Sequence, residues 1–151
     1  NIAGLFYRAF VNEKLKRYNF ARLDYQNLLV LVPGNFQAQL GLALLNEKDQ
    51  HLTEAYDGIN SLIEQYPDSA VAYAARGGME KERGMLDLAV YDYGEAMRLD
   101  STCQDYVVNH ADLLISLGRK SEAYDDLRRL QKMGVKSGQL QDFFARLRRK
   151  K

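Results

Sequence analysis

The stretch from Tyr73 to Asp100 reads YAARGGMEKERGMLDLAVYDYGEAMRLD. Over its second half, from Leu86 to Leu99, apolar residues recur at steps of three and four, the period of a helix that buries one face. Gly84 stands before this half, and glycine readily takes the left-handed conformation that ends a helix. The stretch therefore predicts two helices joined by a short turn.

The same pattern returns along the chain at a step of 34 residues. Four columns share this step: Ala9, Ala43, Gly77 and Ala111; Ala21, Ala55, Ala89 and Ala123; Tyr25, Ile59, Tyr93 and Leu127; Pro33 and Pro67. Small residues suit a close crossing of two helices, and large ones fill the space between successive hairpins. A fixed step predicts a repeat array in which each unit buries its apolar face against its neighbours.

The repeats predict helices near residues 2–15, 18–32, 36–49, 52–66, 70–83, 86–99, 104–117, 120–133 and 138–149. Asp100, Ser101 and Thr102 offer N-cap chemistry to the helix that follows them. The helix near 138–149 begins a fifth unit and has one apolar and one polar face, so we expect it to cap the array.

These residues resemble the tetratricopeptide repeat, which has a small residue, a turn glycine, an alanine, an aromatic and a proline in this order. The resemblance covers residues 1–137 as four repeats, about 2–35, 36–69, 70–103 and 104–137, before a capping helix and basic tail at 138–151. It implies an all-α fold, a right-handed α-α superhelix (solenoid) of helix hairpins. The chain departs from the pattern at the turn glycine, where it has Lys16 and Gln50.

The resemblance also implies a concave groove, lined by the first helix of each hairpin, that binds a peptide or protein segment. The residues that it assigns to this groove are Phe6, Tyr7, Phe10, Leu40, Leu44, Lys48, Lys81, Asn109 and Asp112. Exposed apolar residues mark an interaction site, so the aromatic end would anchor a partner and the polar residues would set its direction. The alternative is that a preceding repeat covers Phe6 and Phe10.

One subclass of the family clamps the acidic C-termini of heat-shock chaperones with Lys, Asn and Arg in the groove columns. Here those columns hold Phe6, Phe10, Gly41, Val71 and Ala75, so we expect no such clamp.

The sequence offers few candidate catalytic residues. Cys103 and His110 lie seven residues apart, with Asp105 and Asp112 nearby, which is a possible nucleophilic arrangement. His110 shares its column with Leu42, however, and this favours a packing role. With two histidines and one cysteine there is no zinc-type spacing, and no phosphate-binding glycine motif occurs. We expect no enzyme activity, no metal and no cofactor.

Two groups of acidic residues invite a functional interpretation. Glu80 and Glu82 are interpreted as solvated charges on a helix. Aspartate also recurs before the aromatic column of the second helices, at Asp24, Asp92 and Asp126. We expect this column to be solvated or paired with basic neighbours such as Arg22 and Arg128.

The net charge of +1 hides an asymmetry. Residues 1–118 carry ten Lys and Arg against sixteen Asp and Glu, whereas residues 119–151 carry eleven against four. A basic end favours an anionic partner, a nucleic acid or an anionic surface, or self-association with another copy. The acidic groove makes nucleic acid the less favoured partner. A regulatory module of a larger enzyme is a further alternative.

No apolar run approaches the ~20 residues of a membrane-spanning helix. The chain begins with Asn1 rather than Met, so we interpret it as a soluble piece of a longer protein, without a targeting segment of its own and with its compartment open. Cys103 is the only cysteine, which excludes an intramolecular disulfide.

Overall fold

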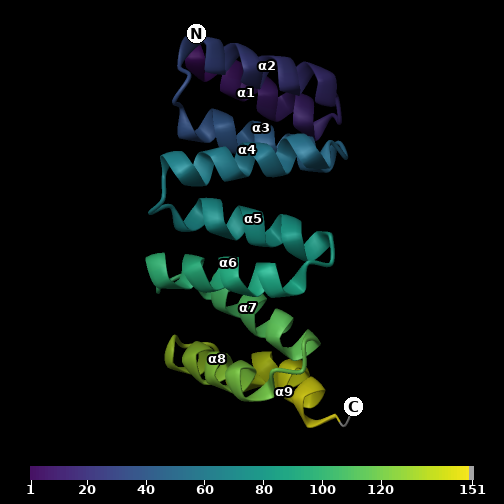
Figure 1. Cartoon of the computed structure of the whole chain (residues 1–151), viewed down its shortest axis with the longest axis vertical. Coiled ribbons are helices and arrows are strands. Elements are labelled where there is room, and N and C mark those ends of the chain that lie inside the picture. Colours follow the sequence, from purple (N-terminus) through teal and green to yellow (C-terminus); the bar gives the residue numbers. More distant parts are fainter. Residues whose placement is uncertain (150–151) are drawn as a thin grey trace. The chain divides into compact units, whose positions relative to one another are not determined.

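The computed structural model describes residues 1–149, and in this part of the chain helices joined by short turns account for all regular structure (Figure 1). The chain divides into two compact units, Asn1–Pro67 and Asp68–Lys151. The boundary follows Pro67, one of the two prolines expected between repeats. Lys150 and Lys151, the end of the predicted basic tail, lie outside the described residues.

The first unit consists of two helix hairpins. Helix α1 (Ile2–Lys14) packs on α2 (Tyr18–Leu31), and α3 (Phe36–Lys48) packs on α4 (Leu52–Gln65). Contacts between α2 and α3 join the two hairpins.

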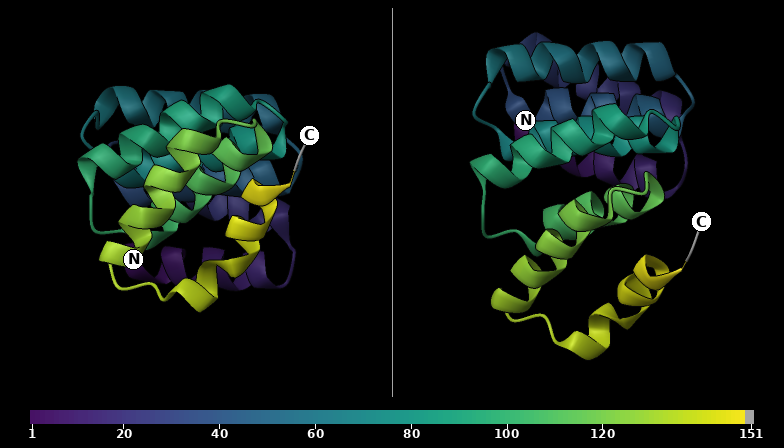
Figure 2. Two further views of the ribbon diagram at one scale, coloured as in Figure 1. Left: turned by 90° about the horizontal axis from the view of Figure 1, so that it is seen from below. Right: turned by 60° about the horizontal axis from the view of Figure 1, so that its bottom comes forward.

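The second unit has the same arrangement with an added cap. Helix α5 (Ala70–Glu82) packs on α6 (Leu86–Leu99), and α7 (Gln104–Ser116) packs on both α6 and α8 (Lys120–Lys132). A 3₁₀ turn, η1 (Ser137–Leu140), leads into α9 (Gln141–Arg148), which packs against α7. Figure 2 shows this return of the chain at its C-terminal end.

The small-residue columns lie in the core, as the repeat pattern predicts. Ala9, Ala21, Ala89 and Ala123 are fully buried. A Cβ atom added at Gly77 would lie 2.9 Å from the ring of Tyr93, so the ring occupies space that a larger residue would need. The close approach of the helices therefore depends on these small residues.

The first helix of each hairpin begins at an equivalent position, 34 residues after the last. The side chains of Asn1, Asn35 and Ser69 each accept a hydrogen bond from a backbone N–H in the first turn. Within the described residues, Cys103 stands at the fourth such position without a side-chain cap. The predicted capping role of Asp100 is wrong, because its carboxylate accepts from the N–H and hydroxyl of Thr102 and holds the turn instead.

The turn inside each hairpin requires a left-handed residue. Gly84 and Gly118 adopt φ angles of 78° and 76°, and Lys16 and Gln50 adopt 60° and 63° at the equivalent positions. The first two turns therefore keep the geometry of the glycine turns, with residues that adopt it at an energetic cost.

The aspartate column is buried rather than solvated. Asp24, Asp92 and Asp126 are each at most 7% exposed. Their partners lie on the preceding helix, at Arg8, Arg76 and His110. The predicted partners are wrong: Arg22 pairs with Asp49, and Arg128 pairs with Asp125.

Glu80 also departs from the prediction of a solvated charge. Its side chain is buried, and its carboxylate lies 4.0 Å from the Nε of Arg76. Glu82 is exposed, as expected. Glu80 stands one helical turn after Arg76, on the side of α5 from which the Arg76 guanidinium reaches Asp92 of α6.

Candidate functional site

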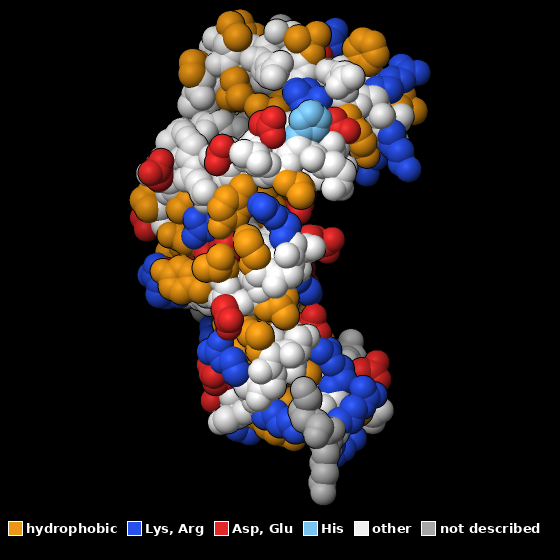
Figure 3. Space-filling model, turned by 45° about the vertical axis from the view of Figure 1, so that its right-hand side comes forward, with side chains coloured by type: hydrophobic (Ala, Val, Ile, Leu, Met, Phe, Trp, Pro, Cys, Tyr) orange, Lys and Arg blue, Asp and Glu red, His pale blue; other side chains and the backbone are white. Residues whose placement is uncertain are grey.

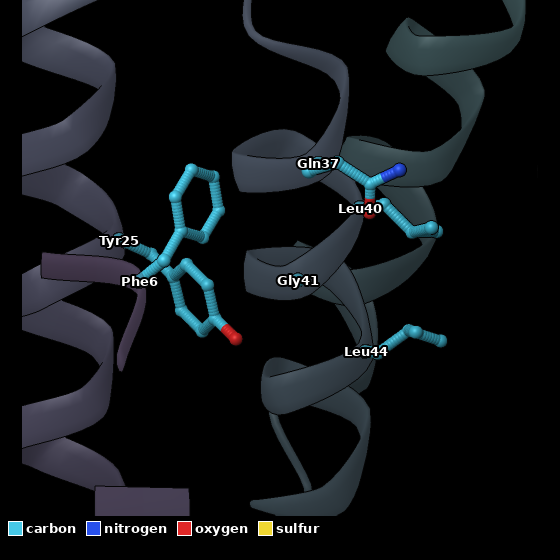
Figure 4. A pocket seen from close by; sticks show the side chains of 6 residues that line it. All are labelled: Phe6, Tyr25, Gln37, Leu40, Gly41 and Leu44. Carbon is cyan, nitrogen blue, oxygen red and sulfur yellow. The ribbon is translucent and has the colours of Figure 1, made fainter. Parts of the chain in front are cut away.

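The first unit contains a pocket of about 320 Å³. Its lining comes from three helices: Phe6 on α1, Tyr25 on α2, and Gln37, Leu40, Gly41 and Leu44 on α3. Figure 4 shows the rings of Phe6 and Tyr25 next to each other. Apart from the Gln37 amide and the Tyr25 hydroxyl, the side chains of the pocket are apolar.

Gly41 shapes this pocket. A Cβ atom at this position would lie 2.6 Å from Cε1 of Tyr25, closer than real contacts allow. The absence of a side chain lets the Tyr25 ring lean over α3 and form a wall of the pocket. Tyr25 was predicted to fill the gap between hairpins, and the structure gives it this second role.

The Tyr25 hydroxyl is held by an ionic network. It donates a hydrogen bond of 2.5 Å to Oε1 of Glu13, and the other oxygen of Glu13 lies 3.2 Å from Nζ of Lys48. Burial, together with the bond to Glu13, raises the pKa of Tyr25 far above its ordinary value. Lys48 is therefore tied to the pocket wall through Glu13, although its own side chain is 57% exposed.

The predicted groove residues of the first unit separate into two groups. Phe6, Leu40 and Leu44 line the pocket together. Tyr7 and Phe10 are 70% and 55% exposed on α1 and are not part of its lining. The Phe10 ring instead lies 5.2 Å from Nζ of Lys14.

The predicted groove residues of the second unit form a polar cluster. The carboxylate of Asp112 on α7 forms two ion pairs. One of its oxygens lies 3.0 Å from Nζ of Lys81, and the other lies 2.5 Å from a guanidinium nitrogen of Arg146 on α9. Asn109 accepts a long bond of 3.4 Å from Lys81 and donates to the backbone oxygen of Asp105. Lys81, Asn109 and Asp112 are thus brought together, and Arg146 joins them.

The charges of this cluster set the ionisation of Asp112. Burial alone would raise the pKa of its carboxyl. Hydrogen bonds from Arg146 and Lys81, and the positive charges of both, outweigh this effect and hold the pKa below its ordinary value. Asp112 is therefore a carboxylate at neutral pH.

Arg146 was missed because α9 was regarded only as a cap. It lies 34 residues after Asp112, so continuing the groove column by one more step would have found it. The signal for Tyr25 was weaker, because only the structure shows that its ring meets Gly41.

The possible nucleophilic arrangement is not assembled. Nδ1 of His110 lies 2.5 Å from Oδ2 of Asp126, so its partner is neither Asp105 nor Asp112. Cys103 stands at the N-terminus of α7. Among residues 1–149, no group of three or more His, Cys, Asp and Glu side chains is placed to hold a metal ion.

Lys and Arg side chains gather over the lower part of the second unit, where α8 and α9 lie (Figure 3). Arg119, just before α8, and Arg128, on α8, pair with acidic residues of that helix. Arg129, Lys132 and Arg148 have no acidic partner among the described residues. Across residues 1–149, every helix is too short or too polar to span a bilayer.

Solved structures share this fold. A tetratricopeptide repeat protein from Parabacteroides merdae superposes with a TM-score of 0.85 and 17% identity, covering 97% of this chain and 58% of its own. A tetratricopeptide repeat protein of Thermus thermophilus gives 0.70 with 16% identity over 89% and 75%. The protein MamA gives 0.76 with 17% identity over 88% and 78%. The predicted all-α fold of tetratricopeptide hairpins is confirmed.

No protein-family model matches the chain. A stretch of 129 residues is 26% identical to the asparagine–tRNA ligase of Buchnera aphidicola, covering 82% of this chain. The chain spans 28% of the length of that ligase, and the match is a distant and partial one.

Proposed function

We propose that this chain is a non-catalytic scaffold that binds a protein segment, and that one apolar side chain of the partner enters the pocket between α1, α2 and α3. Tetratricopeptide folds generally serve protein interaction, and this supports a protein as the partner. The observation that carries the proposal is the pocket itself, which Gly41 leaves open beside Phe6 and Leu44.

The size and lining of the pocket suit a large apolar side chain. Its volume of about 320 Å³ lies at the lower end of ligand sites. Side chains that fill desolvated pockets carry most of the free energy of an interface. Gln37 at the edge has a donor and an acceptor for the backbone of an extended segment. Within the aromatic end of the predicted groove, the pocket lining favours Phe6 over the exposed Phe10 as the anchoring contact.

The polar cluster of Lys81, Asn109 and Asp112 in the second unit is proposed as a separate contact. Its Asp112 carboxylate carries a charge at neutral pH, and Arg146 already occupies one side of it. A cationic side chain of a partner would have to compete with Arg146. The cluster would therefore bind only a cationic side chain that can displace Arg146.

A peptide library displayed on phage and selected on the purified chain tests the proposal. We expect the selected peptides to share one large apolar residue. Leu44→Lys places a charge in the pocket and should weaken a selected peptide at least roughly thirtyfold, about 2 kcal/mol. Tyr91→Ala, at an exposed site on α6, is the matched control and should leave the affinity unchanged.

Circular dichroism must show that both variants keep the helical content of the parent. Equal loss of affinity in both would count against the pocket, as would selected peptides without a shared apolar residue.

A second candidate is an anionic partner at the basic end of the chain. It rests on Arg129, Lys132 and Arg148, which have no acidic partner among the described residues. Binding of a random-sequence oligonucleotide should then fall steeply as salt rises, because counterions are released from the phosphates. Absence of binding at low salt would remove this candidate.

A further inference from the structure

The outer side of α2 carries large apolar residues in water. Phe20, Leu23 and Val30 are 63%, 51% and 79% exposed. In the first unit α2 packs on α1 and α3 (Figure 1). The exposure of these three residues indicates that they lie on its remaining side. With Asn27, which is also exposed, they form a stripe that we call the α2 stripe.

The equivalent positions on the other second helices show which residues stand on this surface when it is exposed to solvent. The exposed residues 34 and 102 positions after Phe20, Leu23 and Val30 are Glu54, Asp57 and Glu64 on α4 and Glu122, Asp125 and Lys132 on α8. On α6, Leu88 and Tyr91 are apolar and Arg98 is charged. The α2 stripe is therefore apolar at positions that α4 and α8 give to charged residues.

The spacing of the stripe is that of a helix–helix contact. Phe20, Leu23, Asn27 and Val30 stand at steps of three and four, the a and d positions of two heptads. On an α-helix these positions fall within about 100° of one another, which is the width of a face that packs on another helix. The occupant that this pattern fits is a helix.

The charge pattern points to a second copy of this chain. In a contact across a two-fold axis, a side chain on the axis meets the same side chain of the second copy. A charged side chain there would be repelled by its equivalent. The α2 stripe holds no charged residue, and the flanking Gln26 is an amide. Amides both donate and accept hydrogen bonds, so Gln26 and Asn27 can pair with copies of themselves.

The surface next to the stripe is also hollowed. A hollow of about 340 Å³ is lined by Phe20, Leu23 and Asp24 on α2, by Arg17 just before α2, and by Arg8 and Asn12 on α1. The protruding apolar side chains of the stripe thus stand beside a recess of the same face. We propose that the α2 stripe packs against the α2 stripe of a second copy, across a two-fold axis.

Sedimentation velocity over a dilution series tests the proposal. The parent should sediment as a species of twice the 17.3 kDa chain mass and dissociate on dilution. The variant Phe20→Glu/Leu23→Asp carries the residues that α8 has at these positions, Glu122 and Asp125, and should stay monomeric at every concentration. Leu88→Glu/Tyr91→Asp makes the same change on α6 and should dimerise like the parent.

A second measurement does not depend on weakening the fold. In a Cys103→Ser background, Asn27→Cys places a thiol within the stripe, near its own copy. Mild oxidation should link this variant into a covalent dimer. Ser61→Cys occupies the equivalent exposed position on α4 and should stay monomeric at the same protein concentration.

Three outcomes would overturn the proposal. The first is a parent that is monomeric throughout the dilution series, which would leave the stripe to a helix of another protein. The second is a dimer that survives Phe20→Glu/Leu23→Asp with its helical content intact. The third is equal cross-linking of Asn27→Cys and Ser61→Cys.

Discussion

Arg76 on α5 and Asp92 on α6 are joined by two hydrogen bonds, from Nε at 2.7 Å and from a terminal guanidinium nitrogen at 2.8 Å. The Asp92 side chain is 2% exposed, so this pair crosses the interior of its hairpin. Two further pairs have the same separation of 16 residues: Arg8 with Asp24, and His110 with Asp126.

The second repeat lacks such a pair and has Leu42 and Gly58 at the two positions. Both partners are thus replaced together. This fits the energetics of buried ion pairs, since removing one partner is costly and removing both is tolerated.

The fourth repeat allows a direct test of this coupling. His110→Leu leaves the Asp126 carboxylate buried without its partner and should lower the free energy of unfolding by about 3 kcal/mol. The double variant His110→Leu/Asp126→Gly copies the second repeat and should recover part of this loss. Urea unfolding of both variants measures the difference. A double variant less stable than the single one would show that the two positions are not coupled.

The left-handed turns predict two stabilising changes. Lys16→Gly and Gln50→Gly should each raise the free energy of unfolding by about 1 kcal/mol, because glycine adopts a positive φ angle without strain. Gly118→Lys is the reverse change and should lower it by a similar amount. Thermal melts give the sign of all three. A glycine variant that melts below the parent would mean that the Lys16 and Gln50 turns are not strained.

The uncapped start of α7 predicts a third stabilising substitution. Cys103→Asn places an amide at the start of α7, in the position that Asn35 holds at the start of α3. This new cap should raise the free energy of unfolding by about 1 kcal/mol. Ser69→Ala removes the cap of α5 and serves as the control, with a loss of similar size. Urea unfolding checks both. No gain from Cys103→Asn together with the expected loss from Ser69→Ala would show that the turn before α7 already satisfies its first N–H groups.

The Asp112 cluster predicts a dependence on pH. The folded protein holds the pKa of this carboxyl below its ordinary value of 3.8. Its interactions with Arg146 and Lys81 therefore stabilise the fold above pH 3.8, and this stabilisation is lost as the pH falls below 3.8. Asp112→Asn should be less stable than the parent at neutral pH by at most about 1 kcal/mol, because the cluster is partly exposed.

The gap between parent and Asp112→Asn should narrow in acid. Denaturant unfolding of both proteins at neutral pH and at several points below 3.8 measures this change. A gap that stays constant over the whole range would show that the effect of the substitution is not electrostatic.

The period of the sequence was sufficient to predict the helices. The first helix was expected over 2–15 and runs from Ile2 to Lys14, and the sixth was expected over 86–99 and runs from Leu86 to Leu99. Every expected helix except the sixth ends one residue early, because residues such as Leu15 and Asp49 continue the pattern but act as caps. The last helix was expected from 138 and begins at Gln141, after the 3₁₀ turn η1. Burial of Ala21 and Ala89 also follows from the period, since a repeated small residue marks a repeated close crossing.

What the period could not show is which side chains of different helices meet. The sequence places Asp92 on a face of its helix, but Arg76 becomes its partner only through the crossing of α5 and α6. The same holds for Tyr25, whose ring reaches Gly41 of the next hairpin, and for Arg146, which reaches Asp112 from α9. Local spacing determines helices because their hydrogen bonds are local. Ion pairs and pockets depend on side-chain directions across packed helices, and only the tertiary structure decides those.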